Sequence, residues 1–139
     1  MAQVNLTPAN KEKALAAFVA FLEWVDKYEI ETIATEEKVY FPHCAGKLDW
    51  KLKLLGRQGV IDFKSSKAIY PEMRYQTAKY RSADPDNEFH AVLRLDKEIG
   101  LPEYKEFKNY EKDLDVFNKM EALYFARHPR LAKNAGWGG

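Results

Sequence analysis

The feature that most constrains the fold is a pair of alternating segments joined by a glycine-containing turn. Between residues 46 and 55 every second side chain is apolar, at Leu48, Trp50, Leu52 and Leu54, and the charged side chains between them share the opposite face. Residues 59–66 alternate again, after a Gly-Arg-Gln-Gly segment at 56–59 that is typical of a hairpin turn. The sequence therefore predicts two antiparallel strands with a charged face.

The other segments predict a mixed sheet with helices packed against it. Thr7-Pro8 is typical of a helix start, and helical spacing continues to about residue 28. We expect a strand at 30–41 with Ile33, Val39 and Phe41 on one face, a helix at 71–82, a hairpin of strands at 89–96 and 102–108 around Gly100, and a helix at 109–127. The apolar residues expected to face inward on that last helix are Leu114, Phe117, Met120, Leu123 and Tyr124. The predicted fold class is α/β, in the order α-β-β-β-α-β-β-α, with one domain over 1–127 and a C-terminal tail over 128–139.

Composition supports a folded domain in a reducing compartment. The chain has 139 residues, of which 46% are hydrophobic and 14% aromatic, enough for one core. Its single cysteine, Cys44, cannot form an internal disulfide or a cysteine-rich zinc site. We find no signal-peptide pattern and no apolar run long enough for a membrane span. The expected location is the cytoplasm, the host cytoplasm if the chain is phage-encoded.

Positive charge is concentrated in the middle of the chain. Nine basic and three acidic residues fall between Lys47 and Arg81, although the whole chain has a net charge of only +1. Such a segment favours a polyanion-binding face, and a solvated charged surface is the alternative. The candidates for phosphate contact are Lys51, Lys53, Arg57, Lys67, Arg74, Lys79 and Arg81.

Three side chains on the predicted hairpin could form a catalytic site. Asp49 lies on the charged face of the first strand, and Asp62 and Lys64, two residues apart on the second, point the same way. A turn at 56–59 would place Asp62 near Leu52 or Leu54, so we expect strand twist to bring the two carboxylates together.

Two carboxylates suit Mg²⁺ or Mn²⁺, which prefer oxygen ligands, and the backbone carbonyl of Phe63 could be a further ligand. The alternative for Asp62 and Lys64 is an exposed ion pair worth at most about 1 kcal/mol. Asp62 fits that alternative poorly, because it lies in the most apolar strand and a buried charge needs a partner.

Three short motifs in this order resemble the PD-(D/E)XK nucleases, in particular the RecB-like exonuclease branch common in phages. AGKLD (45–49) resembles the Gly-x-x-Asp motif, VIDFKSS (60–66) the Asp/Glu-x-Lys motif, and YPEMRYQTAKY (70–80) the Gln-x-x-x-Tyr helix, with Gln76 and Tyr80 in the last. Each motif is weak alone, and the resemblance covers roughly residues 30–125.

This resemblance implies a restriction-endonuclease-like core and a Mg²⁺- or Mn²⁺-dependent deoxyribonuclease. It makes Asp49 and Asp62 metal ligands and Lys64 the catalytic lysine, and it brings Gln76 and Tyr80 to the active centre or the DNA. For Tyr80, core packing against Phe63 is an equal alternative.

The sequence departs from the family pattern in two ways. The first helix lacks the histidine that many relatives use as an extra metal ligand, and Glu36, then Glu23, are the candidates to replace it. The longer N-terminal part of many relatives is also missing, which favours a minimal version or one that depends on a homo-oligomer or a partner protein.

Three functions follow from these features. An exonuclease acting on DNA ends or single strands is the first. A structure-specific endonuclease of the junction-resolvase type is the second, and a catalytically silent DNA-binding module is the third.

Overall fold

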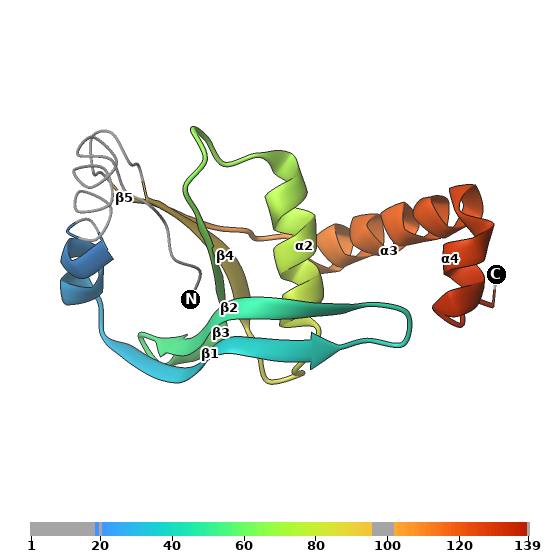
Figure 1. Ribbon diagram of the computed structural model, residues 1–139. Helices are drawn as coiled ribbons and strands as arrows, with labels where there is room; N and C mark the ends of the chain where they lie inside the picture. The colour runs from blue at the N-terminus through green and yellow to red at the C-terminus, as the bar shows by residue number, and fades with distance from the viewer. Residues whose placement is uncertain (1–18, 20, 96–101, 139) are drawn as a thin grey trace, which may run out of the picture.

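The computed structural model describes residues 19, 21–95 and 102–138 (Figure 1). Residues 21–27 are helical and precede a sheet of five strands and three further helices. The strands are β1 (Ile30–Tyr40), β2 (Ala45–Leu54), β3 (Arg57–Lys64), β4 (Phe89–Leu95) and β5 (Pro102–Glu106). The helices are α2 (Pro71–Arg81), α3 (Tyr110–Arg127) and α4 (Pro129–Asn134). The predicted mixed α/β architecture is therefore confirmed.

The strands lie in the sheet in their order along the chain, β1-β2-β3-β4-β5. Neighbours are antiparallel except β3 and β4, which are parallel. Parallel neighbours need a crossover connection, and α2 supplies it here. The start of the predicted first helix, and Gly100 at the centre of the second predicted hairpin, lie outside the described residues.

The turn between β2 and β3 is tighter than the sequence predicts. Leu54 pairs with Arg57, so the turn consists of Leu55 and Gly56 alone. Both residues have positive φ, 52° and 81°, as a type I′ turn requires. The prediction of a turn at 56–59 was wrong because leucine rarely adopts positive φ and so gives no sequence signal for this turn.

Apolar clusters lie on both faces of the sheet. One contains Trp24, Trp50, Ile61 and Phe89 together with Leu52, Leu54, Ala91 and Leu93. The other contains Val39, Leu48 and Val60, with Tyr80 of α2 packed against it. Because Val60 and Ile61 are consecutive on β3, their side chains point to opposite faces, and α2 therefore covers the Val60 face.

Two predicted side-chain faces differ in the structure: Ile33 is not buried as Val39 is, and part of the predicted inward face of α3 is exposed. Ile33 is 43% exposed because the β1–β2 register shifts between Thr32 and Ala34, a bulge that removes Ile33 from the pairing. On α3, Met120, Leu123 and Tyr124 are also exposed. Figure 1 shows the reason: α3 runs past the edge of the sheet toward α4, so its far half has no sheet beneath it.

The C-terminal segment is more ordered than a simple tail. α4 follows α3 directly, and the His43 ring at the tip of the β1–β2 hairpin contacts both the carbonyl of Ala135 and the Trp137 ring. No helix in the described part of the chain has the length and apolar character needed to cross a membrane.

Candidate active site

Asp49 and Asp62 face each other across β2 and β3. The tight turn pairs Trp50 with Ile61, and one further step in the same register sets Asp49 opposite Asp62. Directly opposed side chains on an antiparallel pair share one face, with Cβ atoms about 5 Å apart. The expected offset between the two carboxylates was therefore wrong, and twist is not needed to bring them together.

The Asp49 carboxylate also ties the diverging ends of the two strands together. Its Oδ2 accepts a hydrogen bond from the backbone N–H of Phe63 at 2.9 Å, just beyond the last paired residues. In a sheet the N–H and C=O of one residue point toward the same neighbouring strand. The carbonyl of Phe63 therefore faces the Asp49 side, as a backbone metal ligand would have to.

Asp62 is a buried carboxylate with one cationic partner. Only 6% of the residue is exposed, and its Oδ2 lies 2.9 Å from the Nζ of Lys64. Burial and a hydrogen bond with Asp49 raise the pKa of Asp62 to about 7, against the opposing effect of Lys64. The protonated form of Asp62 is therefore favoured up to near neutral pH, and a divalent cation at this position would favour the ionised form instead.

The donor set fits a magnesium ion better than a softer metal. Among the described residues no group of three His, Cys, Asp or Glu side chains could hold a metal. Mg²⁺ is commonly bound by one or two carboxylates and otherwise keeps its waters, so two carboxylates and one carbonyl meet its needs. Zn²⁺ sites usually have three or four protein ligands, including His or Cys, which these residues do not offer.

The two glutamates proposed as a third ligand do not complete such a site. Glu36 is opposite Asp49 when the β1–β2 register is continued between Thr35↔Trp50 and Glu37↔Leu48, but it is exposed and belongs to no three-ligand group among the described residues. Its φ of 50° is unusual for glutamate and marks a local distortion of β1 beside the site. Glu23 lies before β1 and lines a different pocket with Trp24, on the opposite face of the sheet.

Gly46 and Tyr80 form a close contact between β2 and α2. A Cβ on Gly46 would lie 2.7 Å from Cε1 and 2.8 Å from the hydroxyl of Tyr80, so only glycine admits the ring here. Tyr80 thus packs against the Val39 cluster. The alternative of packing against Phe63 was wrong, because Phe63 stacks on Trp50 at the other face.

Gln76 lies one helical turn before Tyr80 and is exposed. Its position on α2 leaves its side chain accessible to a ligand.

Most of the predicted phosphate-binding cations have partners within the chain. Arg57 makes two hydrogen bonds to Glu106, and Lys51 pairs with Asp84. Arg74 pairs with the buried Asp113, Arg81 lies over the Tyr110 ring, and Lys79 lies near the rings of Phe41 and Phe117. These five side chains stabilise the fold, and their internal partners do not support phosphate contact as their main role. Lys53 and Lys67, in contrast, are exposed.

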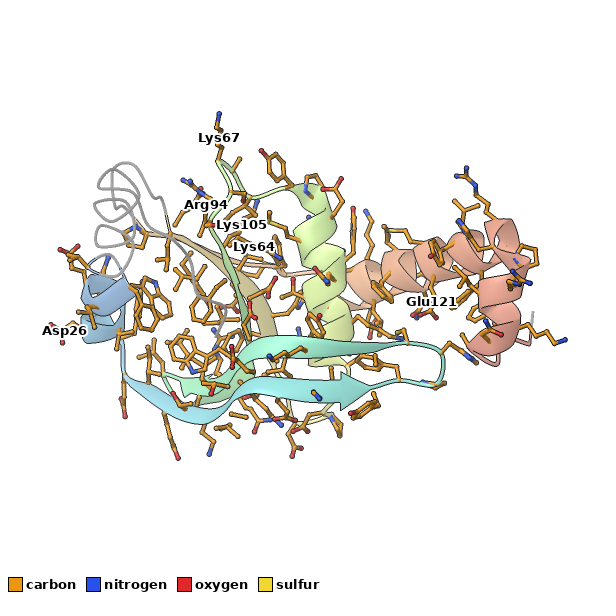
Figure 2. All side chains as sticks on the ribbon, in the orientation of Figure 1. Asp26, Lys64, Lys67, Arg94, Lys105 and Glu121 are labelled. Atoms are coloured by element: carbon orange, nitrogen blue, oxygen red, sulfur yellow. The ribbon has the colours of Figure 1, made fainter. Side chains whose placement is uncertain are left out.

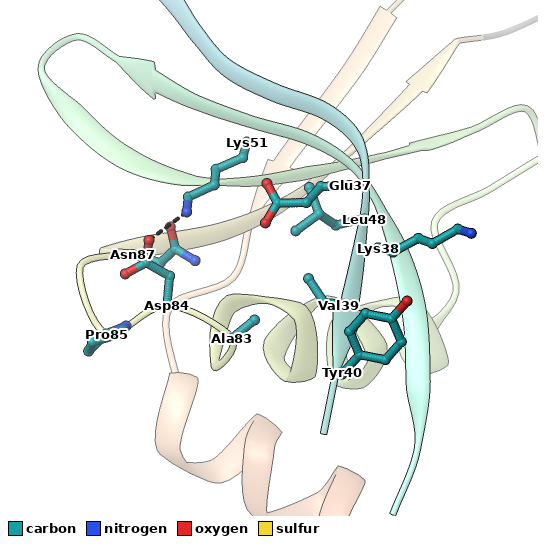
Figure 3. Close-up of a pocket in the computed structure, with 10 residues that line it drawn as sticks. All are labelled: Glu37, Lys38, Val39, Tyr40, Leu48, Lys51, Ala83, Asp84, Pro85 and Asn87. Carbon is teal, nitrogen blue, oxygen red and sulfur yellow. Dashed lines mark hydrogen bonds and ion pairs between the residues drawn. The ribbon is translucent and has the colours of Figure 1, made fainter. Parts of the chain in front are cut away.

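A surface pocket of about 330 Å³ opens beside the candidate site (Figure 3). Its walls include Leu48 and Lys51, which lie on either side of Asp49 along β2, and the turn that follows α2. Lys51 is held there by Asp84, as the dashed line in Figure 3 shows. Neither Asp49 nor Asp62 lines this pocket, so we do not assign it to the reacting groups.

A buried network beneath α2 joins residues that no sequence motif connects. His90 is fully buried, with Nε2 2.9 Å from Asp113 and Nδ1 3.3 Å from Arg81. Because arginine can only donate, Nδ1 is the acceptor and Nε2 carries the proton. Burial lowers the pKa of His90, so the ring is neutral and joins β4 to α2 and α3. No local pattern identifies this network, since its members are distant in sequence.

In comparisons with protein-family models and with curated proteins, the chain has no match.

Proposed function

We propose that the chain is a divalent-metal-dependent deoxyribonuclease with a PD-(D/E)XK type of active site, acting on DNA ends or single strands. The observation that carries this proposal is the hydrogen bond between the carboxyl groups of Asp49 and Asp62, with Lys64 bonded to the Asp62 carboxylate. These contacts support the proposal, because metal-assisted phosphodiester hydrolysis needs groups that hold the cation and a nearby group that stabilises the developing charge.

Burial argues against a merely structural ion pair. An exposed pair of Asp and Lys would gain little and need no second carboxylate. Here the buried Asp62 faces a second acid, Asp49, and the hydrogen bond between them raises the pKa of Asp62. Two acids brought together at a buried position are costly for the fold, and such costs are typical of functional sites.

The metal-holding groups are the carboxylates of Asp49 and Asp62 and the carbonyl of Phe63. The chemistry that a bound Mg²⁺ or Mn²⁺ supplies is polarisation of the phosphodiester and a lower pKa for a coordinated water. Asp62 would hold the cation in its ionised form, and the hydrogen bond from the Phe63 N–H keeps the Asp49 carboxylate in place.

Lys64 is the group available to the reacting phosphate. Its side chain is 30% exposed, so Nζ can reach a substrate while its stem stays against the sheet. An ammonium in this position stabilises the negative charge that develops as the water oxygen bonds to phosphorus. The P–O bond to the leaving group then breaks, the leaving oxygen gains a proton, and a phosphate monoester and a hydroxyl result.

Cleavage assays on matched DNA substrates test the proposal. Purified protein with Mg²⁺ or Mn²⁺ is incubated with linear duplex, linear single-stranded and covalently closed circular DNA, and EDTA serves as the blank. We expect linear substrates to be shortened from their ends while the closed circle stays intact. Cleavage of the circle, or of a four-way junction, would instead show an endonuclease. DNA binding without cleavage by either metal would show a silent binding module and overturn the proposal.

A further inference from the structure

The sheet face that carries Asp62 continues into a row of basic side chains. Asp62 is paired in register with Val92 on β4, and Val92 with Lys105 on β5. In the next row Lys64 pairs with Arg94, and Arg94 with Glu103. Side chains paired in this way share a face, so Lys64, Arg94 and Lys105 all lie on the face of the carboxylate pair.

The segment after β3 adds a fourth cation to this face. Arg94 donates a hydrogen bond from Nη1 to the carbonyl of Ser66 at 3.2 Å, which fixes the 65–68 segment above β4. Lys67 follows Ser66 directly and is exposed. Figure 2 shows Lys64, Lys105, Arg94 and Lys67 on the same side of α2, near the start of that helix. We name these four residues the basic edge.

Two members of the basic edge, Lys67 and Lys105, differ from the paired cations of this region in having no carboxylate partner among the described residues. Arg57, Arg74 and Lys51 are each paired with a carboxylate, and Arg94 is paired with Glu103 at 2.8 Å. Within the described residues, by contrast, no carboxylate pairs with Lys67, and Lys105 contacts only the Phe107 ring at 5.8 Å. Lys67 and Lys105 are therefore two exposed ammonium groups without a carboxylate partner on the side of the site near the start of α2.

We propose that the basic edge, chiefly Lys67 and Lys105, binds the backbone phosphates of the DNA strand that leads to the Asp49–Asp62 site. Strand spacing puts Lys105 about 10 Å from Asp62 along the sheet, a distance of one or two nucleotides. Val92 lies between them and is fully buried, so the DNA cannot contact the sheet surface there. The DNA strand instead passes over the 65–68 segment. Contacts of this kind set affinity and position without reading sequence. This inference rests on the proposed function for its choice of ligand.

Charge reversal at the two exposed lysines tests the inference. Lys67→Glu/Lys105→Glu is compared with the wild type and with Lys38→Glu/Lys112→Glu, a control with the same charge change at exposed positions on β1 and α3. Binding of labelled single-stranded and duplex oligonucleotides is measured by fluorescence anisotropy in EDTA over a range of salt concentrations. Metal-dependent cleavage by the same proteins is measured separately, and circular dichroism verifies that each variant is folded.

We expect the basic-edge variant to bind at least about tenfold more weakly at low salt, and the control to bind as the wild type does. The slope of log affinity against log salt should fall by about 1.4 for single strands or about 1.8 for duplex, since two phosphate contacts are lost. Cleavage by the basic-edge variant at sub-saturating DNA should fall together with its affinity, whereas the control should cleave as the wild type does.

The outcomes separate this inference from the proposed function. If the wild type cleaves DNA but the basic-edge variant binds normally, or if the control weakens binding equally, the basic edge is overturned and the nuclease proposal stands. If the variant alone loses binding and no protein cleaves DNA, the basic edge stands and the nuclease proposal fails. If the wild type binds no DNA at all, the basic edge is overturned.

Discussion

Asp49 accepts a hydrogen bond from the backbone N–H of Phe63, at 2.9 Å, across the end of the β2–β3 pair. This bond replaces the ladder contact where the strands separate, and it turns the Asp49 carboxylate toward the β3 residues on either side of Phe63. Because it accepts this backbone hydrogen bond, the Asp49 carboxylate is held in one position before any ligand binds. The site therefore combines a fixed acid, Asp49, with a buried acid, Asp62, whose proton can be exchanged.

Replacing Lys64 by alanine should abolish cleavage without preventing DNA binding. Loss of an ammonium that stabilises the developing phosphate charge typically lowers kcat on the order of 10²-fold or more. The remaining cations should keep the Kd for DNA within about threefold, because one phosphate contact contributes little to the total. Gel-based cleavage and anisotropy on the same preparations give both quantities.

The matched control for Lys64→Ala is Lys53→Ala, an exposed lysine on β2 at the opposite end of the pair. A Lys64→Ala protein that cuts at the wild-type rate would show that Lys64 has been misassigned.

Asp49→Asn should weaken metal binding. The amide keeps the size of the side chain and an oxygen that can accept from the Phe63 N–H, but it removes one of two negative charges at the site. We expect the Kd for Mn²⁺, measured by isothermal titration calorimetry, to rise at least about tenfold while the unfolding midpoint changes little. Unchanged affinity would exclude Asp49 as a ligand.

The stability of the metal-free protein should decrease as pH rises toward neutrality. The pKa of Asp62 is raised to about 7 in the folded protein, whereas an unfolded aspartate titrates near 4. The folded state thus binds more protons between these values, and its free energy of unfolding falls as pH rises through this window. Urea denaturation in EDTA from pH 4 to pH 8 measures the decline.

Asp62→Asn provides the comparison for this pH dependence. The free energy of unfolding of this variant should fall much less between pH 4 and pH 7, because an amide cannot ionise. In the wild type, Mg²⁺ should restore stability above pH 7 by replacing the proton. If the free energy of unfolding fell equally with pH in the wild type and in Asp62→Asn, Asp62 would not be the group with the raised pKa.

Gly46→Ala should destabilise the contact between β2 and α2. The added methyl would lie 2.7 Å from the Tyr80 ring, and relieving such overlap in a packed region typically costs about 1–3 kcal/mol. The free energy of unfolding from chemical denaturation measures the cost. The double variant Gly46→Ala/Tyr80→Ala should lose less than the sum of the two single variants, since removing the ring makes room for the methyl. Additive losses would show that the ring and the glycine do not interact.

The alternation along β2 and β3 is what the sequence by itself determined about this protein. It predicts both strands, and it sets Asp62 and Lys64 on one face, because side chains two apart on a strand must point the same way. The structure confirms both strands and places Asp62 and Lys64 in contact.

Other features depended on contacts that periodicity does not encode. The pairing of Asp49 with Asp62 follows from a two-residue turn with Leu55 at positive φ, a conformation that leucine does not signal. The neutralisation of Arg57 and Arg74 depends on acids far along the chain, and Glu106 is 49 residues from Arg57. The exposure of Leu123 depends on how far α3 extends beyond the sheet (Figure 1). Local spacing thus determined which way each side chain points, whereas strand register and long-range packing decided which side chains meet.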